Sequence, residues 1–132
     1  MTNPYHAILW IDHKEAKVFS IDSENRIANV ENTAGDTHIH HRAGAMGSGH
    51  EHEDAHYLKA VANALATAHE IVVTGPAQAK LELMHWMKGN APQTAVKVLG
   101  VETLDHPTDG ELVAFAKRYF RAKDRMTPQL PQ

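Results

Sequence analysis

Hydrophobic positions in the first quarter of the chain fall into three short runs of the length that β-strands have, at residues 7–12, 15–21 and 26–31. The first run, A-I-L-W-I-D, is continuously apolar up to its last residue, and the second alternates with a period of two. In the second run Ala16 and Val18 alternate with Lys17 and Phe19, so the two pairs belong to opposite faces of a sheet. Because only short polar turns separate the runs, the pattern predicts three consecutive antiparallel strands.

In the middle of the chain the hydrophobic period lengthens to that of a helix. Leu58, Val61, Ala62 and Leu65 recur at the spacing of one helical face. Acidic residues at 51, 53 and 54 precede them, where the helix dipole favours negative charge. These features predict a helix that begins near residue 51.

Strands and helices alternate in the remainder of the chain. Residues 70–74, E-I-V-V-T, form a short β-branched run that a Gly-Pro turn closes, which is typical of a buried parallel strand. The helix predicted next carries Leu81, Met84 and Met87 on its apolar face. A last strand is predicted at residues 95–101, and the capping box formed by Thr108 and Glu111 predicts the start of a final helix.

The predicted element order is β-β-β-α-β-α-β-α, which indicates a single α/β domain with a mixed sheet and helices on both faces. This order is the one found in ribonuclease H-like folds. The domain is expected to occupy residues 1–125, and the proline-containing residues 126–132 are expected to form a flexible tail. Four aromatic residues are expected in the core or an interface rather than on a base-stacking platform: Trp10, Trp86, Phe115 and Tyr119.

Composition restricts the classes of partner. The chain has 132 residues, 42% of them hydrophobic and 22% charged, which suits one domain with a substantial core. A formal net charge of −3 argues against coating nucleic acid over a whole face, although it allows a local basic site. The absence of cysteine excludes disulfides and thiolate metal sites. No signal peptide or membrane-spanning run is recognisable, so a cytoplasmic protein without a membrane partner is expected.

Residues 37–56, which we term the histidine–glycine segment, concentrate the candidate chemistry. They contain six of the eleven histidines: His38, His40, His41, His50, His52 and His56. Gly44, Gly47 and Gly49 allow backbone angles that other residues avoid, which suits close approach to a ligand. Long segments without regular structure are usually functional or disordered, so the rest of the chain is expected to serve as their scaffold.

The first interpretation of this segment is contact with phosphate. Arg42 offers a planar fork of donors, and the stretch before the predicted helix leads into free amides that favour anions. The candidate nucleic-acid contacts are His41, Arg42, Gly44, Gly47, Ser48, Gly49 and His50. The competing interpretation of the same residues is a solvated loop without a ligand.

The second interpretation is a metal site, with zinc as the candidate ion. The candidate ligands are His38, His40, His52 and His56. His52 to His56 match the H-E-x-x-H pattern of zinc hydrolases, but His69 and Glu70, the third ligands available, are expected about 20 Å away along the helix. A metal-binding module is therefore favoured over a metalloprotease, and no other cofactor is expected. A two-metal nuclease is disfavoured because Asp12 has no matching acid at the end of the 70–74 strand.

Several stretches together resemble a known family: A-I-L-W-I-D, K-V-F-S-I, H-H-R-A-G-A-M-G-S-G-H, I-V-V-T-G-P-A-Q-A-K and T-L-D-H-P-T-D-G-E-L-V-A-F-A. They span residues 4–121. The chain is similar to the middle domain of the eukaryotic and archaeal class-one peptide release factors, to which a domain of the ribosome-rescue protein Pelota is related. Short bacterial proteins of this pattern are commonly labelled translational machinery proteins.

The resemblance implies a translation-associated protein whose partner is the ribosome or a tRNA. In release factors the corresponding loop carries a Gly-Gly-Gln motif that promotes peptidyl-tRNA hydrolysis. Residues 42–49 here read R-A-G-A-M-G-S-G, and the histidine–glycine segment has no glutamine, so hydrolysis is left open. Self-association through an exposed strand edge is also left open.

Overall fold

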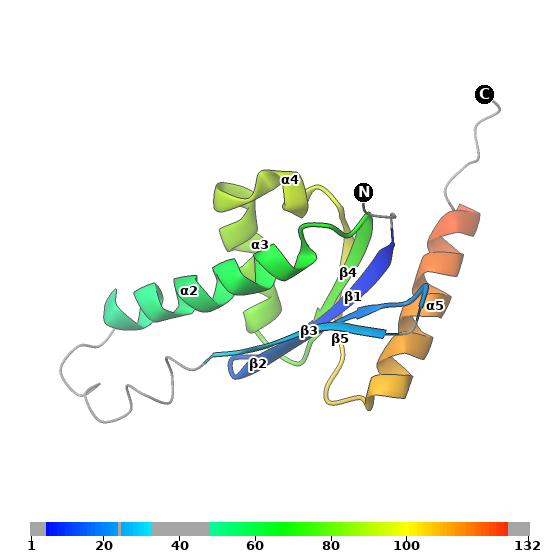
Figure 1. Cartoon of the computed structure of the whole chain (residues 1–132), viewed down its shortest axis with the longest axis horizontal. Coiled ribbons are helices and arrows are strands. Elements are labelled where there is room, and N and C mark those ends of the chain that lie inside the picture. Colours follow the sequence, from blue (N-terminus) through cyan, green and yellow to red (C-terminus); the bar gives the residue numbers. More distant parts are fainter. Residues whose placement is uncertain (1–4, 24, 33–47, 127–132) are drawn as a thin grey trace.

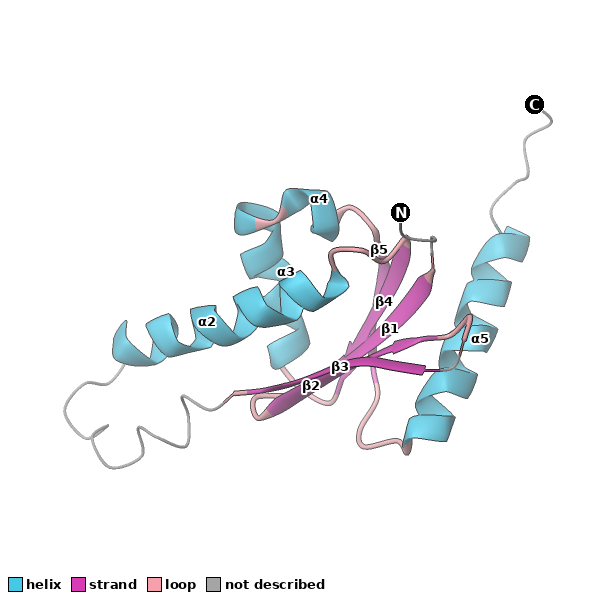
Figure 2. Ribbon diagram, viewed as in Figure 1, coloured by secondary structure: helices cyan, strands magenta, loops and turns pink. Residues whose placement is uncertain are grey.

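The computed structural model describes residues 5–23, 25–32 and 48–126, with the backbone alone described for residues 48–54, 125 and 126. Within these residues the chain forms a five-stranded mixed sheet with helices on both faces (Figures 1 and 2). The predicted α/β class and element order are confirmed, with one short helix added. None of the helices in the described parts combines the length and apolarity needed to cross a bilayer.

The sheet has the strand order β3-β2-β1-β4-β5. Its strands are β1 (His6–Ile11), β2 (Glu15–Ser20), β3 (Asn25–Glu31), β4 (Glu70–Gly75) and β5 (Val98–Thr103). The first three strands pair antiparallel, whereas β4 pairs parallel with both β1 and β5. The central strand β1 is covered on both faces, which explains why all its residues from Ala7 to Ile11 are buried without alternation.

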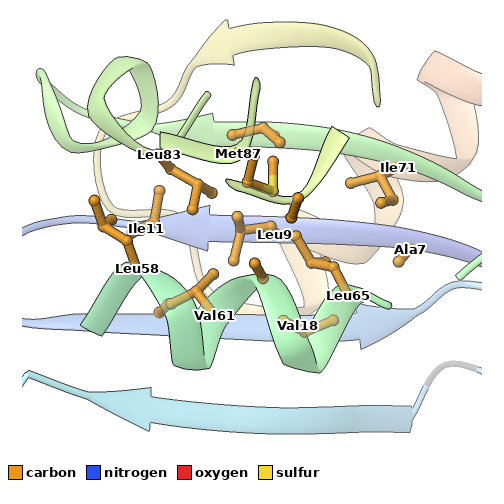
Figure 3. Close-up of a cluster of buried hydrophobic side chains, with 14 of the residues drawn as sticks. Ala7, Leu9, Ile11, Val18, Leu58, Val61, Leu65, Ile71, Leu83 and Met87 are labelled. Atoms are coloured by element: carbon orange, nitrogen blue, oxygen red, sulfur yellow. The ribbon is translucent and has the colours of Figure 1, made fainter. Parts of the chain in front are cut away.

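The helices divide the core into two hydrophobic clusters. They are α2 (Ser48–Leu65), α3 (Ala79–Asn90), α4 (Pro92–Ala95) and α5 (Asp109–Met126). In the first cluster Leu9 and Ile11 of β1 pack against α2 and α3, and the predicted face of α2 from Leu58 to Leu65 is buried there (Figure 3). In the second, Ile8 and Trp10 pack against α5. The alternation along β1 therefore selects which helix each side chain meets.

The start of α5 follows the predicted capping box. The Thr108 hydroxyl accepts a hydrogen bond of 3.1 Å from the Glu111 amide, and the Glu111 carboxylate accepts one of 2.9 Å from the Thr108 amide. Both bonds satisfy donors that the first turn of a helix would otherwise leave free. The capping box is confirmed.

The predicted apolar face of α3 is confirmed at Met87 and, as a partly buried residue, at Met84, but it is wrong at Leu81. Leu81 is 50% exposed, whereas Leu83 is fully buried together with Met87. The helix begins at Ala79, and positions 79, 83 and 87 form the face that meets the first cluster. Leu81 lies well away from that face, so hydrophobicity by itself did not identify the buried side.

Two element boundaries differ from the prediction. Pro92 begins the short helix α4, which occupies the start of the predicted 95–101 strand, so β5 begins at Val98 and runs to Thr103. The helix α2 begins at Ser48 rather than near residue 51, which places Ser48, Gly49 and His50 on a helix. Of the expected tail, Met126 closes α5, and residues 127–132 lie outside the described residues.

Candidate functional site

The histidine–glycine segment begins after β3 and ends within α2, and the structure describes the chain on both sides of residues 33–47. Six predicted nucleic-acid or metal contacts lie outside the described residues: His38, His40, His41, Arg42, Gly44 and Gly47. Four more belong to the first turns of α2, where the backbone alone is described: Ser48, Gly49, His50 and His52. His56, also on α2, is exposed. The described geometry is therefore that of the two anchors on either side of residues 33–47, which are Asn32 before them and Tyr57 after them.

The turn between β1 and β2 is the structural centre of this region. The Asp12 carboxylate oxygen Oδ1 accepts hydrogen bonds from the amides of Lys14, at 2.8 Å, and Glu15, at 2.9 Å. Asp12 thus closes the turn with its own side chain, as aspartate commonly does.

Asn32 fastens the end of β3 to this turn. Its amide donates to the Lys14 carbonyl at 2.8 Å, and its side-chain Nδ2 donates to the His13 carbonyl at 3.0 Å. The Oδ1 atom of Asn32 is buried and has no hydrogen-bond partner among the described residues. The last described residue before the histidine–glycine segment is therefore held at two points.

Tyr57 fastens α2 to the same turn. It is 5% exposed, and its hydroxyl donates to the Asp12 carbonyl at 2.8 Å. The nine residues from Ser48 to His56 precede this anchor and extend α2 by about 13 Å at the rise of an α-helix. Figure 1 shows these first turns projecting past the sheet. Both attachment points thus meet at the β1–β2 turn, next to the carboxyl end of β1.

Two histidines that the sequence prediction missed lie at this end of the sheet. His13, in the β1–β2 turn, has its Nδ1 atom 4.0 Å from the Glu82 carboxylate of α3. His106, which follows β5, has its Nε2 atom 4.0 Å from the Asp12 carboxylate and its ring 5.2 Å from that of Trp10. The rule that residues following parallel strands gather at one edge would have identified His106.

The Trp10 indole holds the chain that carries His106. Its Nε1 atom donates to the carbonyls of Leu104, at 3.2 Å, and Asp105, at 3.1 Å. Trp10 is 3% exposed and belongs to the second hydrophobic cluster, as expected for a core residue. A buried donor thus positions the segment after β5 beside Asp12, which brings an exposed histidine next to the attachment points.

The metal interpretation stays a prediction, because the side chains of three of its four candidate ligands, His38, His40 and His52, lie outside what the structure describes. No group of three metal-binding side chains comes together among the described residues. Glu70, one of the third ligands considered for the H-E-x-x-H match, lies at the amino end of β4, where its carboxylate is 3.0 Å from Nε2 of His6. His69 precedes it at the same end, with its ring 6.2 Å from that of His6. Since α2 separates both residues from His56, they lie far from this predicted ligand.

Two hollows open elsewhere on the described surface. One of about 290 Å³ is lined by residues that include Phe19, Asp109 and Lys117. The Asp109 carboxylate accepts a 2.6 Å hydrogen bond from Arg26, and this bond holds the pKa of Asp109 below its ordinary value. The other, of about 450 Å³, has carboxylates and basic groups on the same wall: His6, Asp22, Lys117, Arg121 and Asp124. Each hollow is lined by both acidic and basic groups, so neither resembles a site for a charged ligand.

No protein family model matches the sequence, and comparison with curated proteins finds no significant relative. Solved structures do match the fold. Pelota from Archaeoglobus fulgidus matches 92% of the chain over 33% of its own length, with a TM-score of 0.64 and 16% identity. Pelota from Thermoplasma acidophilum matches 91% over 34% of its length, with a TM-score of 0.61 and 22% identity. The archaeal translation termination factor aRF1 matches 91% over 39% of its length, with a TM-score of 0.57 and 11% identity.

The chain therefore spans between a third and two fifths of the length of the solved proteins that it matches. At these identities the likeness is one of fold. The chain is similar in fold to about a third of Pelota and to a comparable part of aRF1, which confirms the expected release-factor-like fold.

Proposed function

We propose that this protein is a translation-associated factor that presents the histidine–glycine segment to ribosomal RNA or tRNA during ribosome rescue or peptide release. The fold supports a role of this class, because one of its structural neighbours is a translation termination factor and others are Pelota proteins. At these identities the solved structures share only their fold with this chain. A local feature of the structure supports the proposal as well.

The observation that carries the proposal is the attachment of both flanks of the segment to one turn. Asn32 and Tyr57 bind three successive carbonyls of the β1–β2 turn, those of Asp12, His13 and Lys14. Such bonds hold the two flanks close together on a rigid sheet. A segment displayed in this way reaches a partner from a fixed base, which is the arrangement expected of a binding element on a scaffold.

The residues within the segment supply the chemistry of RNA contact. His41, Arg42, Ser48 and His50 contact phosphate or ribose in this proposal, while Gly44, Gly47 and Gly49 permit close approach. Histidines gain protons readily beside an anion, so a cluster of them becomes locally basic in a chain of net charge −3. Binding is therefore expected to strengthen as the pH falls from 8 to 6 and to weaken with salt.

Co-sedimentation with ribosomes tests the proposal. The His41→Ala/Arg42→Ala variant is expected to lower the bound fraction at least about fivefold at moderate salt, because it removes two phosphate contacts. The matched control is His85→Ala/Lys88→Ala, which removes one histidine and one cation from exposed positions of α3 and is expected to bind normally. Equal binding of the first variant and the unaltered protein would contradict the proposal.

Two further measurements separate the proposal from its alternatives. Metal analysis of untagged protein purified without nickel should find no stoichiometric zinc, and ribosome binding should survive a chelator. Peptidyl-tRNA hydrolysis on stalled ribosomes is a separate test, since a reaction in the absence of the usual glutamine would require His50 or Glu51 to position water. If ribosome binding required zinc, the histidines would act as metal ligands rather than as direct contacts to RNA.

A further inference from the structure

The second half of α5 carries a charge opposite to that of the whole chain. Residues 117–124 contain four basic residues and one acidic residue, a net charge of +3, whereas the chain has −3. The basic residues are Lys117, Arg118, Arg121 and Lys123, and the acidic one is Asp124. This concentration on one helix is the feature that the proposed function leaves unexplained.

The two arginines lie on the solvent side of α5. Leu112, Ala116 and Phe120 form the buried face that packs on the sheet. At 100° per residue, positions 118 and 121 lie more than about 130° from the centre of that face. Both arginines are accordingly exposed. Their guanidinium groups are therefore available to an external partner.

Stabilisation of the helix does not account for these arginines. Within the described parts of the chain, neither Arg118 nor Arg121 has an acidic group within 4.0 Å, in contrast to Arg26, which Asp109 holds. The helix ends at Met126, so the arginines precede the last turn, where the helix dipole would favour them. They are three residues apart, and Lys117 lies four residues before Arg121. Like charges at these spacings repel one another.

An ordered aromatic pair borders Arg118 on the side of α5 that lies over β5. The rings of Phe115 and Tyr119 stack with centroids 5.9 Å apart, and both side chains are partly exposed. Tyr119 lies tightly over β5, since a Cβ atom added to Gly100 would come within 1.9 Å of its hydroxyl oxygen. Lys123 lies over the same ring at 5.5 Å. The pair belongs to the edge of the core, as expected, yet it also offers aromatic surface beside a cation.

We propose that the solvent side of α5, with Arg118 and Arg121, and its border over β5, with Phe115 and Tyr119, together form a second RNA-binding surface that takes single-stranded RNA. The arginines contact phosphates, and the exposed part of the aromatic pair stacks against a base. The positive charge favours a polyanion as the partner. The adjoining aromatic surface favours a polyanion that carries bases, rather than a lipid headgroup or an acidic protein.

This surface is distinct from the histidine–glycine segment. Phe120 of α5 packs against His6 at the amino end of β1, with ring centroids 4.8 Å apart, whereas Tyr57 is anchored beyond its carboxyl end. The six residues of β1 separate these points by roughly 20 Å. Figure 1 shows the end of α5 and the start of α2 on opposite sides of the molecule. RNA contact at α5 is therefore testable independently of the proposed function.

The test measures binding of the full chain to a fluorescent 16-nucleotide single-stranded RNA by anisotropy at several salt concentrations. Arg118→Ala/Arg121→Ala is expected to weaken binding at least tenfold and to reduce the slope of log affinity against log salt by about 1.4, the value for two phosphate contacts on a single strand. Tyr119→Leu is expected to weaken binding about tenfold with a smaller change in slope. Thermal unfolding checks that each variant is folded.

The matched control is Lys59→Ala/Lys88→Ala, which removes the same charge from exposed positions on the helices of the opposite face. It is expected to bind RNA normally. Equal losses in the control and in the arginine variant would overturn the proposal, because the effect would then follow net charge. Arginine-dependent binding of equal strength to polyglutamate or phosphatidylserine vesicles would also overturn it. A loss of oligonucleotide binding only in His41→Ala/Arg42→Ala would leave the proposed function intact and refute the α5 surface.

Discussion

At the residue scale, the candidate site depends on a few hydrogen bonds around the β1–β2 turn. Asp12 closes the turn with its carboxylate, and its carbonyl accepts the Tyr57 hydroxyl. Asn32 uses both its amide and its side chain on the next two carbonyls. Each such bond contributes only about 1 kcal/mol net, so their importance lies in where they hold the chain. Substitutions that remove one of these hydrogen bonds should therefore change the position of the histidine–glycine segment more than they change the stability of the whole protein.

Removing the Tyr57 hydroxyl should demonstrate this effect. Tyr57→Phe is expected to lower the free energy of unfolding by about 1 kcal/mol, because it breaks the bond to the Asp12 carbonyl while the ring stays packed. The amides in the first turns of α2 should exchange faster with solvent, and ribosome binding should fall. Chemical denaturation and hydrogen exchange measure the two effects. The control is Tyr5→Phe, whose exposed hydroxyl bond to Thr67 should contribute less than about 0.5 kcal/mol. Equal effects of the two changes would contradict the anchoring role.

At the element scale, the parallel pairing of β1 and β4 forms the rigid base of the site. β1 is buried on both faces, and it pairs with β4 in parallel register from His6 opposite Glu70 to Trp10 opposite Thr74. Gly75, the last residue of β4, lies against Ile11, so that an added Cβ atom would be 2.2 Å from the Ile11 carbonyl oxygen. Because this contact is to backbone, no side-chain rotation can relieve it. The β1–β2 turn begins at the next residue, which links this contact to the attachment points.

Gly75→Ala is expected to destabilise the protein by about 1–3 kcal/mol or more, since the strands must separate locally. Gly89→Ala is the matched substitution, because an added Cβ atom at this exposed position of α3 meets nothing within 4 Å. It should stabilise the protein by up to about 1 kcal/mol through helix propensity. Thermal and denaturant unfolding of both variants provide the measurement. If Gly75→Ala left the free energy of unfolding unchanged, the ends of β1 and β4 would be able to move apart at little cost.

At the scale of the whole molecule, we expect the body to fold independently of residues 37–46 of the histidine–glycine segment. Both hydrophobic clusters draw most of their residues from the sheet and from α2, α3 and α5. The second proposed RNA contact, on α5, belongs to the body and lies at the other end of β1. The anchors of the histidine–glycine segment thus lie at one end of the molecule, and the basic part of α5 lies at the other.

Replacing residues 37–46 with a glycine–serine stretch of equal length tests whether the body folds independently of them. The variant is expected to keep its melting temperature within about 4 °C, a shift that corresponds to less than roughly 1 kcal/mol, because its anchors and clusters remain. It should lose most of its ribosome binding while retaining affinity for the single-stranded oligonucleotide through α5. Calorimetry, co-sedimentation and anisotropy measure the three quantities. Loss of folding would show instead that the segment is part of the body.

The sequence by itself determined the features that repeat locally. The alternation of Ala16 and Val18 with Phe19 assigned these side chains to the two clusters on opposite faces of the sheet. The spacing from Leu58 to Leu65 identified the buried face of α2, and Thr108 with Glu111 marked the start of α5. Such patterns are readable because each depends on neighbours within about one turn or two pleats of the backbone.

Only the tertiary structure decided what distant segments share. The burial of Leu83 instead of Leu81 depends on how α3 sits on the sheet, and the meeting of Asp12, Asn32 and Tyr57 joins three elements that no local period connects. The early start of α2 was also hidden, since helical turns that project beyond the core need no apolar period. Local chemistry therefore determined which residues form each element, whereas packing determined which carbonyl, carboxylate or ring each residue contacts.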